Sequence, residues 1–203
     1  MKILSSVLLI LLTFLMCSVL FSALNSDIIG AWDFPFSGPV KIEIVEFSGG
    51  DRYNDSVRFQ DNILILKHAG GDAVLLNSTA VLIKGIGNAY VGIPGSDGSL
   101  IYGDMTVFYE NLDAGLKNSA FEKNNEEMLK DGFWSAGELL VLTGNDSLNS
   151  SASSVFVTAD GQNKTSNNYG FSSGQTAEIQ IYRQNKSTFQ MILKTGAEVF
   201  KNK

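Results

Sequence analysis

Val40-Lys-Ile-Glu-Ile-Val-Glu-Phe47 places apolar and polar residues in near-complete alternation. Successive side chains of a β-strand point to opposite faces of a sheet, so this period of two predicts a half-buried strand. Similar short apolar runs recur along the rest of the chain. Further strands are expected at 56–67, 73–84, 138–142, 154–158, 176–183 and 187–194. The last two form a predicted hairpin around residues 184–186.

These strands are short and are separated by turn signals, without the regular helices of a βαβ pattern. Such a pattern is typical of a mainly β fold, and we expect an antiparallel Ig-like β-sandwich over residues 40–203. Residues 85 to about 132 begin with short strands near 90–91 and 105–109 that glycines separate, and then lose β character, which predicts an insertion on this domain. Within it, residues 112–130 predict a short polar helix. The Asn/Ser/Gly-rich segments 143–154 and 160–174 are expected to be loops.

An apolar segment precedes the β pattern. Residues 3–24 read ILSSVLLILLTFLMCSVLFSAL and contain no charge. As a helix this segment would span about 33 Å, close to the hydrocarbon thickness of a bilayer. We therefore expect a hydrophobic stem or transmembrane helix within residues 1–30. Residues 31–39, whose prolines cannot continue a helix, are the expected linker.

Three interpretations of the apolar segment remain open: a permanent membrane anchor, the stem helix of a filament subunit, and a cleaved secretory signal. Its length favours the first two, because the apolar core of a signal peptide is usually shorter. Lys2 precedes the segment and Asp27 follows it. The positive-inside rule therefore predicts a cytoplasmic N-terminus and an extracellular β domain.

Composition limits the partners and the sources of stability. The 203 residues include 15 Lys and Arg against 21 Asp and Glu, a formal net charge of −6. An acidic surface argues against nucleic acid as a partner. The single cysteine, Cys17, lies in the apolar segment. The outer domain therefore has no internal disulfide and must be held by its core, by assembly, or by both.

N-glycosylation sequons are frequent in the part of the chain expected outside the cell. The candidate acceptors are Asn54, Asn77, Asn145, Asn149, Asn163 and Asn185. Loops rich in Asn, Ser and Thr also generate such triplets without modification. Their number nevertheless favours an exported glycoprotein, on which glycans would solubilise and shield the surface.

Candidate chemistry centres on the only histidine. His68 and Asp72 flank Gly70 and Gly71, which can supply the positive φ of a tight turn. An acid/base pair or half a metal site is one interpretation. A structural turn, in which the imidazole and the carboxylate bond across the glycines, is favoured because no second histidine and no nucleophile motif accompanies His68. We therefore expect no enzyme activity, no catalytic or metal site and no cofactor.

Two other groups of residues have structural interpretations. Trp32 and Trp134 are expected to be core or interfacial anchors. Glu122, Glu126 and Glu127 are expected to form one solvated face of the short helix.

Two segments carry a resemblance to a known family. Ile63-Leu-Ile-Leu-Lys-His-Ala-Gly-Gly-Asp-Ala-Val-Leu-Leu76 resembles the strand and His-x-Gly-Gly-Asp turn of archaeal pilin-like proteins. Asp131-Gly-Phe-Trp-Ser-Ala-Gly-Glu-Leu-Leu-Val-Leu142 is similar to an aromatic and glycine element of the same proteins. With the apolar stem, they make the chain similar to archaeal type IV pilins and archaeal flagellins. The resemblance implies a structural subunit of a pilus or archaellum, or a minor pilin.

Two functions from different classes follow. In the first, stem helices of many copies polymerise into the core of an extracellular type IV pilus-like filament. The glycosylated β domains then form its sheath, for adhesion or contact with surface glycans and cells, and each subunit waits in the membrane before assembly. In the second, the chain is a membrane-anchored or secreted monomer whose β-sandwich binds a glycan or a cell-wall component.

Overall fold

The computed structural model describes residues 38–50, 62–91, 99–148, 153–162, 165–185 and 188–201. These residues belong to one compact unit, residues 38–203. The predicted stem, and all of the predicted linker except Gly38 and Pro39, lie outside the described ranges. Within those ranges, no helix is both long enough and apolar enough to cross a bilayer.

The described chain is mainly β, as predicted, and its smaller main sheet has four strands in the order β12-β1-β2-β7. Their bounds are β1 Lys41–Gly49, β2 Ile63–Gly70, β7 Leu139–Thr143 and β12 Phe200–Lys201. The strand expected from the alternation at 40–47 is β1. It pairs antiparallel with β2, and β2 pairs antiparallel with β7. The short strand β12 joins the other edge of β1 in parallel.

The larger sheet has the strand order β11-β10-β4-β5-β8, and β9 pairs with the C-terminal part of β4. Its strands are β4 Thr79–Val91, β5 Ser99–Tyr109, β8 Val155–Ala159, β9 Thr165–Phe171, β10 Thr176–Asn185 and β11 Thr188–Glu198. The predicted terminal hairpin is confirmed as β10 and β11, which pair antiparallel along their length. A small third sheet joins β3 (Val74–Leu75) to β6 (Phe133–Trp134), and the 3-10 turn η2 (Leu76–Ser78) links β3 to β4.

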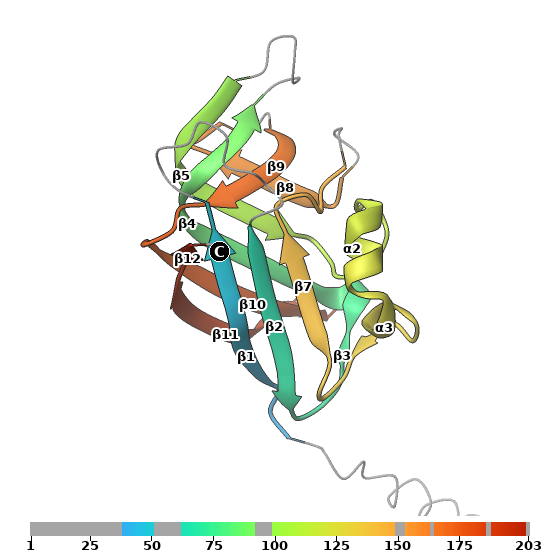
Figure 1. Ribbon diagram of the computed structural model, residues 1–203. Helices are drawn as coiled ribbons and strands as arrows, with labels where there is room; N and C mark the ends of the chain where they lie inside the picture. Colours follow the sequence, from blue (N-terminus) through green and yellow to red (C-terminus); the bar gives the residue numbers. More distant parts are fainter. Residues whose placement is uncertain are drawn as a thin grey trace, which may run out of the picture. The chain divides into compact units, whose positions relative to one another are not determined.

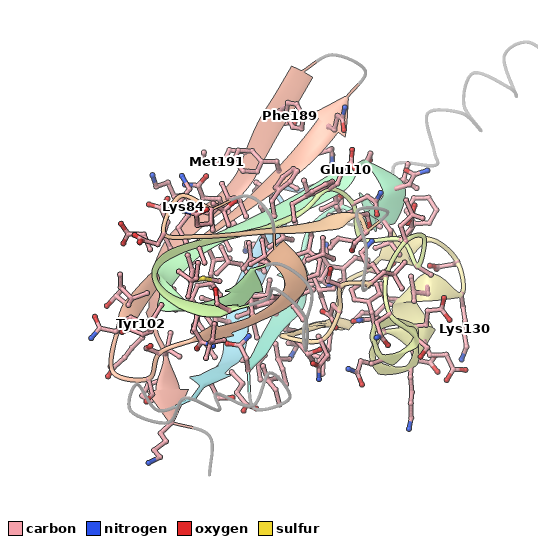
Figure 2. All side chains as sticks on the ribbon, turned by 90° about the horizontal axis from the view of Figure 1, so that it is seen from above. Lys84, Tyr102, Glu110, Lys130, Phe189 and Met191 are labelled. Atoms are coloured by element: carbon pink, nitrogen blue, oxygen red, sulfur yellow. The ribbon has the colours of Figure 1, made fainter. Side chains whose placement is uncertain are left out.

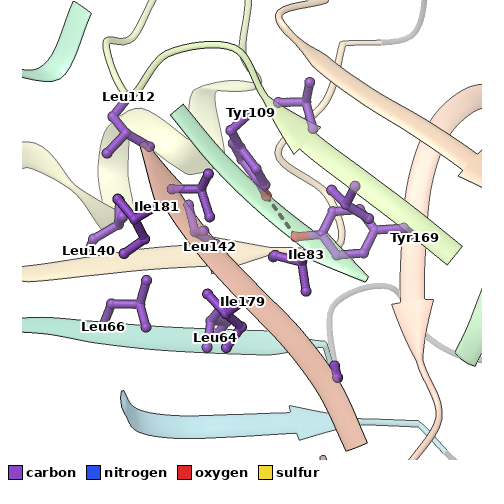
Figure 3. Close-up of a cluster of buried hydrophobic side chains, with 14 of the residues drawn as sticks. Leu64, Leu66, Ile83, Tyr109, Leu112, Leu140, Leu142, Tyr169, Ile179 and Ile181 are labelled. Carbon is purple, nitrogen blue, oxygen red and sulfur yellow. Dashed lines mark hydrogen bonds between the residues drawn. The ribbon is translucent and has the colours of Figure 1, made fainter. Parts of the chain in front are cut away.

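The hydrophobic core lies between the two large sheets. Figure 1 shows β1, β2 and β7 in front of β4, β10 and β11. Both layers contribute fully buried aliphatic side chains, labelled in Figure 3: Leu64, Leu66, Leu140 and Leu142 from the smaller sheet, and Ile83, Ile179 and Ile181 from the larger. The rings of Phe47 on β1 and Phe171 on β9 also meet across the layers, with centroids 5.7 Å apart. Burial of this apolar surface supplies the main stabilisation, in a domain without cysteine.

The first half of the region predicted as an insertion, 85–132, forms strands of the larger sheet. Residues 85–91 continue β4 and residues 99–109 form β5, so both lie in the larger sheet itself. The glycines of these two strands permit close backbone approach. Gly87 pairs with Gly103, and a Cβ on Gly87 would collide with the carbonyl oxygen of Gly170 on β9. Such a strand glycine marks a place where another backbone approaches closely.

The second half of that region contains helix, as predicted. It forms two short helices, α2 (Ser119–Asn124) and α3 (Glu126–Leu129). Phe121 and Met128 are buried on their inner side, whereas Leu116 is 57% exposed and has a left-handed backbone with φ 59°. Leu116 is therefore not part of the buried side of these helices.

The predicted glutamate face lies in solvent. Glu122, Glu126 and Glu127 are all exposed, and Glu127 bonds to Lys130 on the surface of α3. That bond raises the pKa of the Lys130 ammonium.

Part of the predicted loop 160–174 is a strand. Residues 165–171 form β9, which pairs with β4 and carries the buried rings of Tyr169 and Phe171. Its sequence, Thr-Ser-Asn-Asn-Tyr-Gly-Phe, lacks the apolar alternation that predicts strands. Tertiary packing of two aromatic rings, rather than strand propensity, positions this segment.

Candidate functional site

The outer face of the larger sheet, which points away from the smaller sheet, contains a groove of about 680 Å³. Figure 2 shows Lys84, Met191 and Phe189 on this side of the molecule. The groove runs over β5, β4, β10 and β11. Its main polar lining residues are Lys84, Asp104, Thr106, Thr176, Glu178 and Lys194, and Gly85 and Gly196 contribute backbone.

Strand register brings the polar residues of the groove together. Glu178 on β10 pairs with Gly196 on one side and with Lys84 on the other, and Lys84 pairs in turn with Thr106. Directly paired residues on neighbouring strands point to the same face of the sheet. The groove is open above β11 because Gly196 has no side chain, and a Cβ there would meet no atom closer than 3.5 Å.

Opposite charges are spread along the groove. Lys194 Nζ lies 3.1 Å from Glu178 Oε2. The hydrogen bond from Lys194 holds the pKa of the Glu178 carboxyl below its ordinary value, and the charge of Lys84 acts in the same direction. The other Glu178 oxygen accepts from the side-chain amide of Gln180. The two lysines of the groove balance its two acids, Asp104 and Glu178, so its formal charge is zero.

Next to the groove, the same outer face becomes apolar. The sheet register places Leu82, Phe108 and Phe156 in one row across β4, β5 and β8. The rings of Phe108 and Phe156 have centroids 6.3 Å apart and planes inclined by only 27°, and Phe156 is 49% exposed. We refer to these two rings as the aromatic plate.

A second apolar group lies on the terminal hairpin. Tyr182 pairs with Met191, and the Tyr182 ring meets Phe189 edge-on with centroids 6.5 Å apart. Phe189 is 61% exposed and Met191 48% exposed. Outer-face apolar surface therefore extends from β8 to the edge strand β11, which is typical of an interaction surface.

The most strongly perturbed titratable groups lie elsewhere, in the core. Tyr109 donates to Asp146 Oδ2 at 2.8 Å, and its hydroxyl oxygen lies 2.7 Å from that of Tyr169 (Figure 3 shows the tyrosine pair). Because the Tyr109 proton goes to the carboxylate, Tyr169 is the donor of the second bond. Asp146 also accepts from the amide and the hydroxyl of Thr143, at 2.7 and 2.6 Å.

Burial sets the titration of this cluster. It raises the pKa of Asp146 to about 6, although two hydrogen bonds from Thr143, one from Tyr109 and the charge of Lys117 stabilise the carboxylate. Burial also raises the pKa of Tyr109 and of Tyr169 well above the ordinary value. All three groups are fully buried, and their bonds join β5, β9 and the turn after β7. We interpret the cluster as a structural polar network.

Lys117 is a second buried polar group, and its hydrogen bonds have a structural role. Its Nζ donates to Asn111 Oδ1 at 2.8 Å, to the Asp113 carbonyl at 2.7 Å and to Ser154 Oγ at 3.0 Å. Burial lowers its pKa to about 8. These bonds close the loop between β5 and α2, and they use all three ammonium protons.

The His68 turn differs from the prediction in one bond. The imidazole Nε2 lies 2.9 Å from the main-chain carbonyl oxygen of Asp72, rather than bonding to the Asp72 carboxylate, and the side chain of Asp72 is exposed. Gly70 and Gly71 have positive φ, as expected of the turn. His68 is fully buried and packs edge-on against Trp134, with centroids 5.8 Å apart, so Trp134 is a core residue. Trp32 lies outside the described residues.

Two sequon asparagines have described side chains. Asn77 is exposed, but the hydroxyl of Thr79, the third residue of its triplet, is buried and donates to the Leu75 carbonyl at 2.8 Å. Asn145 is half-buried and is followed by Asp146 and Ser147, which are both buried. Asn185 belongs to β10. Asn54, Asn149 and Asn163 lie outside the described residues.

Neither the groove nor the tyrosine network was anticipated from the sequence. The sequence contained part of the information for the groove, because Lys84, Thr106 and Glu178 occupy outward positions of strands in which apolar and polar residues alternate. Which strands pair, and in which register, could not be taken from that alternation. In the part of the chain that the structure describes, no group of three or more His, Cys, Asp or Glu side chains could hold a metal ion. No family model, curated protein or solved structure matches the chain.

Proposed function

We propose that this chain is a structural subunit of an extracellular type IV pilus-like filament. The observation that carries the proposal is the uncharged segment Ile3–Leu24 directly ahead of a mainly β domain. Such a segment can leave the bilayer only by cleavage or by burial against other apolar surface. Packing against copies of itself satisfies this requirement and gives the domain a function that needs no catalysis. Small residues such as Ser5, Ser18 and Ala23 would permit close helix approach.

In this proposal the two sheets form an Ig-like sandwich that lies in the filament sheath. Its core is apolar and contains no cysteine, so it needs no oxidising step to fold. The subunit resides in the membrane with a cytoplasmic N-terminus before assembly, and glycans on the outer domain shield the finished filament. The filament then serves adhesion or surface contact.

Electron microscopy of native surface material tests this proposal. Helical filaments that contain the chain support it, whereas a monodisperse monomer extracted from membranes would contradict it. N-terminal sequencing of the natural product gives an independent test. A start near Met1 or Ile3 agrees with a retained stem, and a start near Leu24 or Asn25 indicates a cleaved signal and refutes polymerisation through this segment.

A second candidate function is favoured by a specific observation. The groove and the aromatic plate make one face of the larger sheet both hollowed and partly apolar. Pockets with a few convergent polar groups beside apolar surface are typical of ligand sites. A membrane-anchored or secreted monomer that binds a glycan or a cell-wall component would use such a face. Analytical ultracentrifugation of the full chain in detergent distinguishes a stable monomer from a polymerising subunit.

A further inference from the structure

We propose that the outer face of the larger sheet binds a neutral saccharide chain. Polar side chains of the groove would form hydrogen bonds with the hydroxyls of one sugar, and the aromatic plate would pack against the apolar face of the next sugar. This inference gives the second candidate function a site and a ligand class. It does not require the chain to be monomeric, because a filament subunit could carry the same site.

The polar half of the site matches a polyol. Lys84 and Lys194 supply donors, Asp104 and Glu178 supply acceptors, and the Thr106 hydroxyl supplies both. No carboxylate among the described residues lies within salt-bridge distance of Lys84, whose ammonium is therefore available to a ligand. A sugar presents both donors and acceptors from each hydroxyl, so it can satisfy this mixed set.

The charge balance of the groove argues against an anionic ligand. Its two lysines are offset by Asp104 and Glu178, and Glu178 already bonds Lys194. A phosphate or uronate placed beside these two carboxylates would meet repulsion as well as attraction. Recognition of an anion usually relies on a surplus of cations, often as bidentate arginine. A neutral ligand avoids this conflict.

The apolar half explains why a saccharide is favoured over a purely polar ligand. Phe108 lies two residues after Thr106 on β5, and Phe156 lies two residues before Thr158 on β8. The two rings therefore point to the same outer face as these threonines. Two residues of a strand span about 7 Å, so the plate lies about one sugar ring from the groove. The near-parallel rings offer a flat apolar surface, and the C–H face of a pyranose ring is flat and apolar as well. Both halves lie on paired strands, which fixes their separation before any ligand binds.

A second copy of the chain fits this face less well than a saccharide. The centres of protein–protein interfaces are depleted of charged residues. Here, however, Lys84, Glu178 and Lys194 lie together in the hollow part of the face. Docking of another flat sheet would bury these charges without filling the groove above Gly196.

The test measures saccharide binding to the full chain in detergent by titration calorimetry. The neutral probes are cellohexaose, maltohexaose and chitohexaose, and the acidic probe is hexagalacturonate. We expect at least one neutral probe to bind and hexagalacturonate to bind more weakly. Lys84→Ala and Phe156→Ala should each weaken binding about fivefold to tenfold. This is the loss expected when a ligand loses one polar contact or its contact with the exposed half of an aromatic ring.

Matched controls lie on other parts of the domain. Lys41→Ala removes an exposed lysine from β1, and Phe133→Ala removes a 41% exposed ring from β6. Both should leave binding unchanged, and thermal unfolding should show all four variants folded.

Several outcomes overturn the inference. These are no binding of any neutral probe at millimolar concentration, tighter binding of hexagalacturonate, equal losses in the control variants, or self-association without sugar that Phe156→Ala abolishes. The last outcome would assign the face to a second copy instead. Electron microscopy and sugar titration of the wild-type chain separate this inference from the filament proposal. Intact filaments of a wild-type chain that binds no sugar refute only the site, and sugar binding by a wild-type chain that forms no filaments refutes only the filament.

Discussion

Replacement of Tyr109 by phenylalanine tests the buried polar network most directly. The Tyr109 hydroxyl is the middle member of a chain in which Tyr169 donates to Tyr109 and Tyr109 donates to Asp146. Phenylalanine keeps the ring and its packing, so the change removes the two bonds without a large cavity. All three side chains are fully buried, and water cannot easily replace the lost hydroxyl.

The structure gives the size of the effect. The bond to the Asp146 carboxylate contributes about 1.5–3 kcal/mol, as a hydrogen bond to a charged group. The Tyr169 hydroxyl would lose its acceptor and remain buried, which costs a further ~1–3 kcal/mol. Tyr109→Phe should therefore lower the free energy of unfolding by about 2.5–6 kcal/mol in total. Tyr169→Phe removes only a bond between neutral groups and should cost about 1 kcal/mol.

The double variant is the decisive measurement. When both hydroxyls are absent, both bonds are lost but no unpaired hydroxyl remains, and loss of the bond between the two tyrosines is then nearly neutral. We therefore expect Tyr109→Phe/Tyr169→Phe to cost about 1.5–3 kcal/mol, less than Tyr109→Phe alone. Urea unfolding of the full chain and the three variants, followed by circular dichroism, gives these free energies. A double variant whose cost equals the sum of the two single variants would refute the proposed chain of bonds.

Three further changes test other parts of the structure. Burial raises the pKa of Asp146 to about 6, above its unfolded value, so folding favours the neutral carboxyl. As the pH falls from about 6 to about 4, the wild-type protein should gain ~2 kcal/mol of stability relative to Asp146→Asn, measured by urea unfolding at each pH. Asn125 is buried and bonds both the amide and the carbonyl of Val141, at 2.8 and 2.9 Å. Asn125→Ala should therefore cost about 2–4 kcal/mol in the same assay and expose the α2–α3 segment to limited proteolysis. Gly87→Ala would force a Cβ against the Gly170 carbonyl, so we expect it to separate β9 from β4 and to accelerate amide exchange in β9.

Each of these three predictions has a control variant or an outcome that would contradict it. An unfolding difference between wild type and Asp146→Asn that stays constant with pH would show that the carboxyl does not titrate in this range. Asn124→Ala, at an exposed position beside Asn125, should be nearly neutral, and an equal loss there would point to helix propensity rather than to the bonds with β7. A Cβ on Gly196 would make only ordinary van der Waals contact, at 3.5 Å from the Thr176 methyl group, so Gly196→Ala should leave amide exchange unchanged.

Local patterns predicted most of the strands because a strand needs only its own alternation to be recognised. β1, β7, β8, β10 and β11 lie within a few residues of their expected positions. The prediction failed where another part of the chain supplies the reason for the structure. The glycines of β4 and β5 allow close backbone contacts, and β9 is held by Tyr169 and Phe171 rather than by strand propensity.

The His68 turn shows the same division between local and tertiary information. The glycines made the turn predictable, and the positive φ of Gly70 and Gly71 agrees with it. The acceptor of the imidazole is nevertheless a main-chain carbonyl, because the buried ring lies against Trp134 and the Asp72 side chain points to solvent.

The sequence alone determined that this protein has an uncharged apolar segment ahead of a mainly β domain whose only cysteine lies in that segment. These are properties of composition and of periods of a few residues, which do not depend on distant parts of the chain. Only the tertiary structure decided which outward-facing residues become neighbours. Glu178, Lys84 and Thr106 are far apart in the sequence, and strand register joins them into one groove beside the aromatic plate. Register depends on how all the strands bury their apolar faces together, so no single stretch of sequence can specify it.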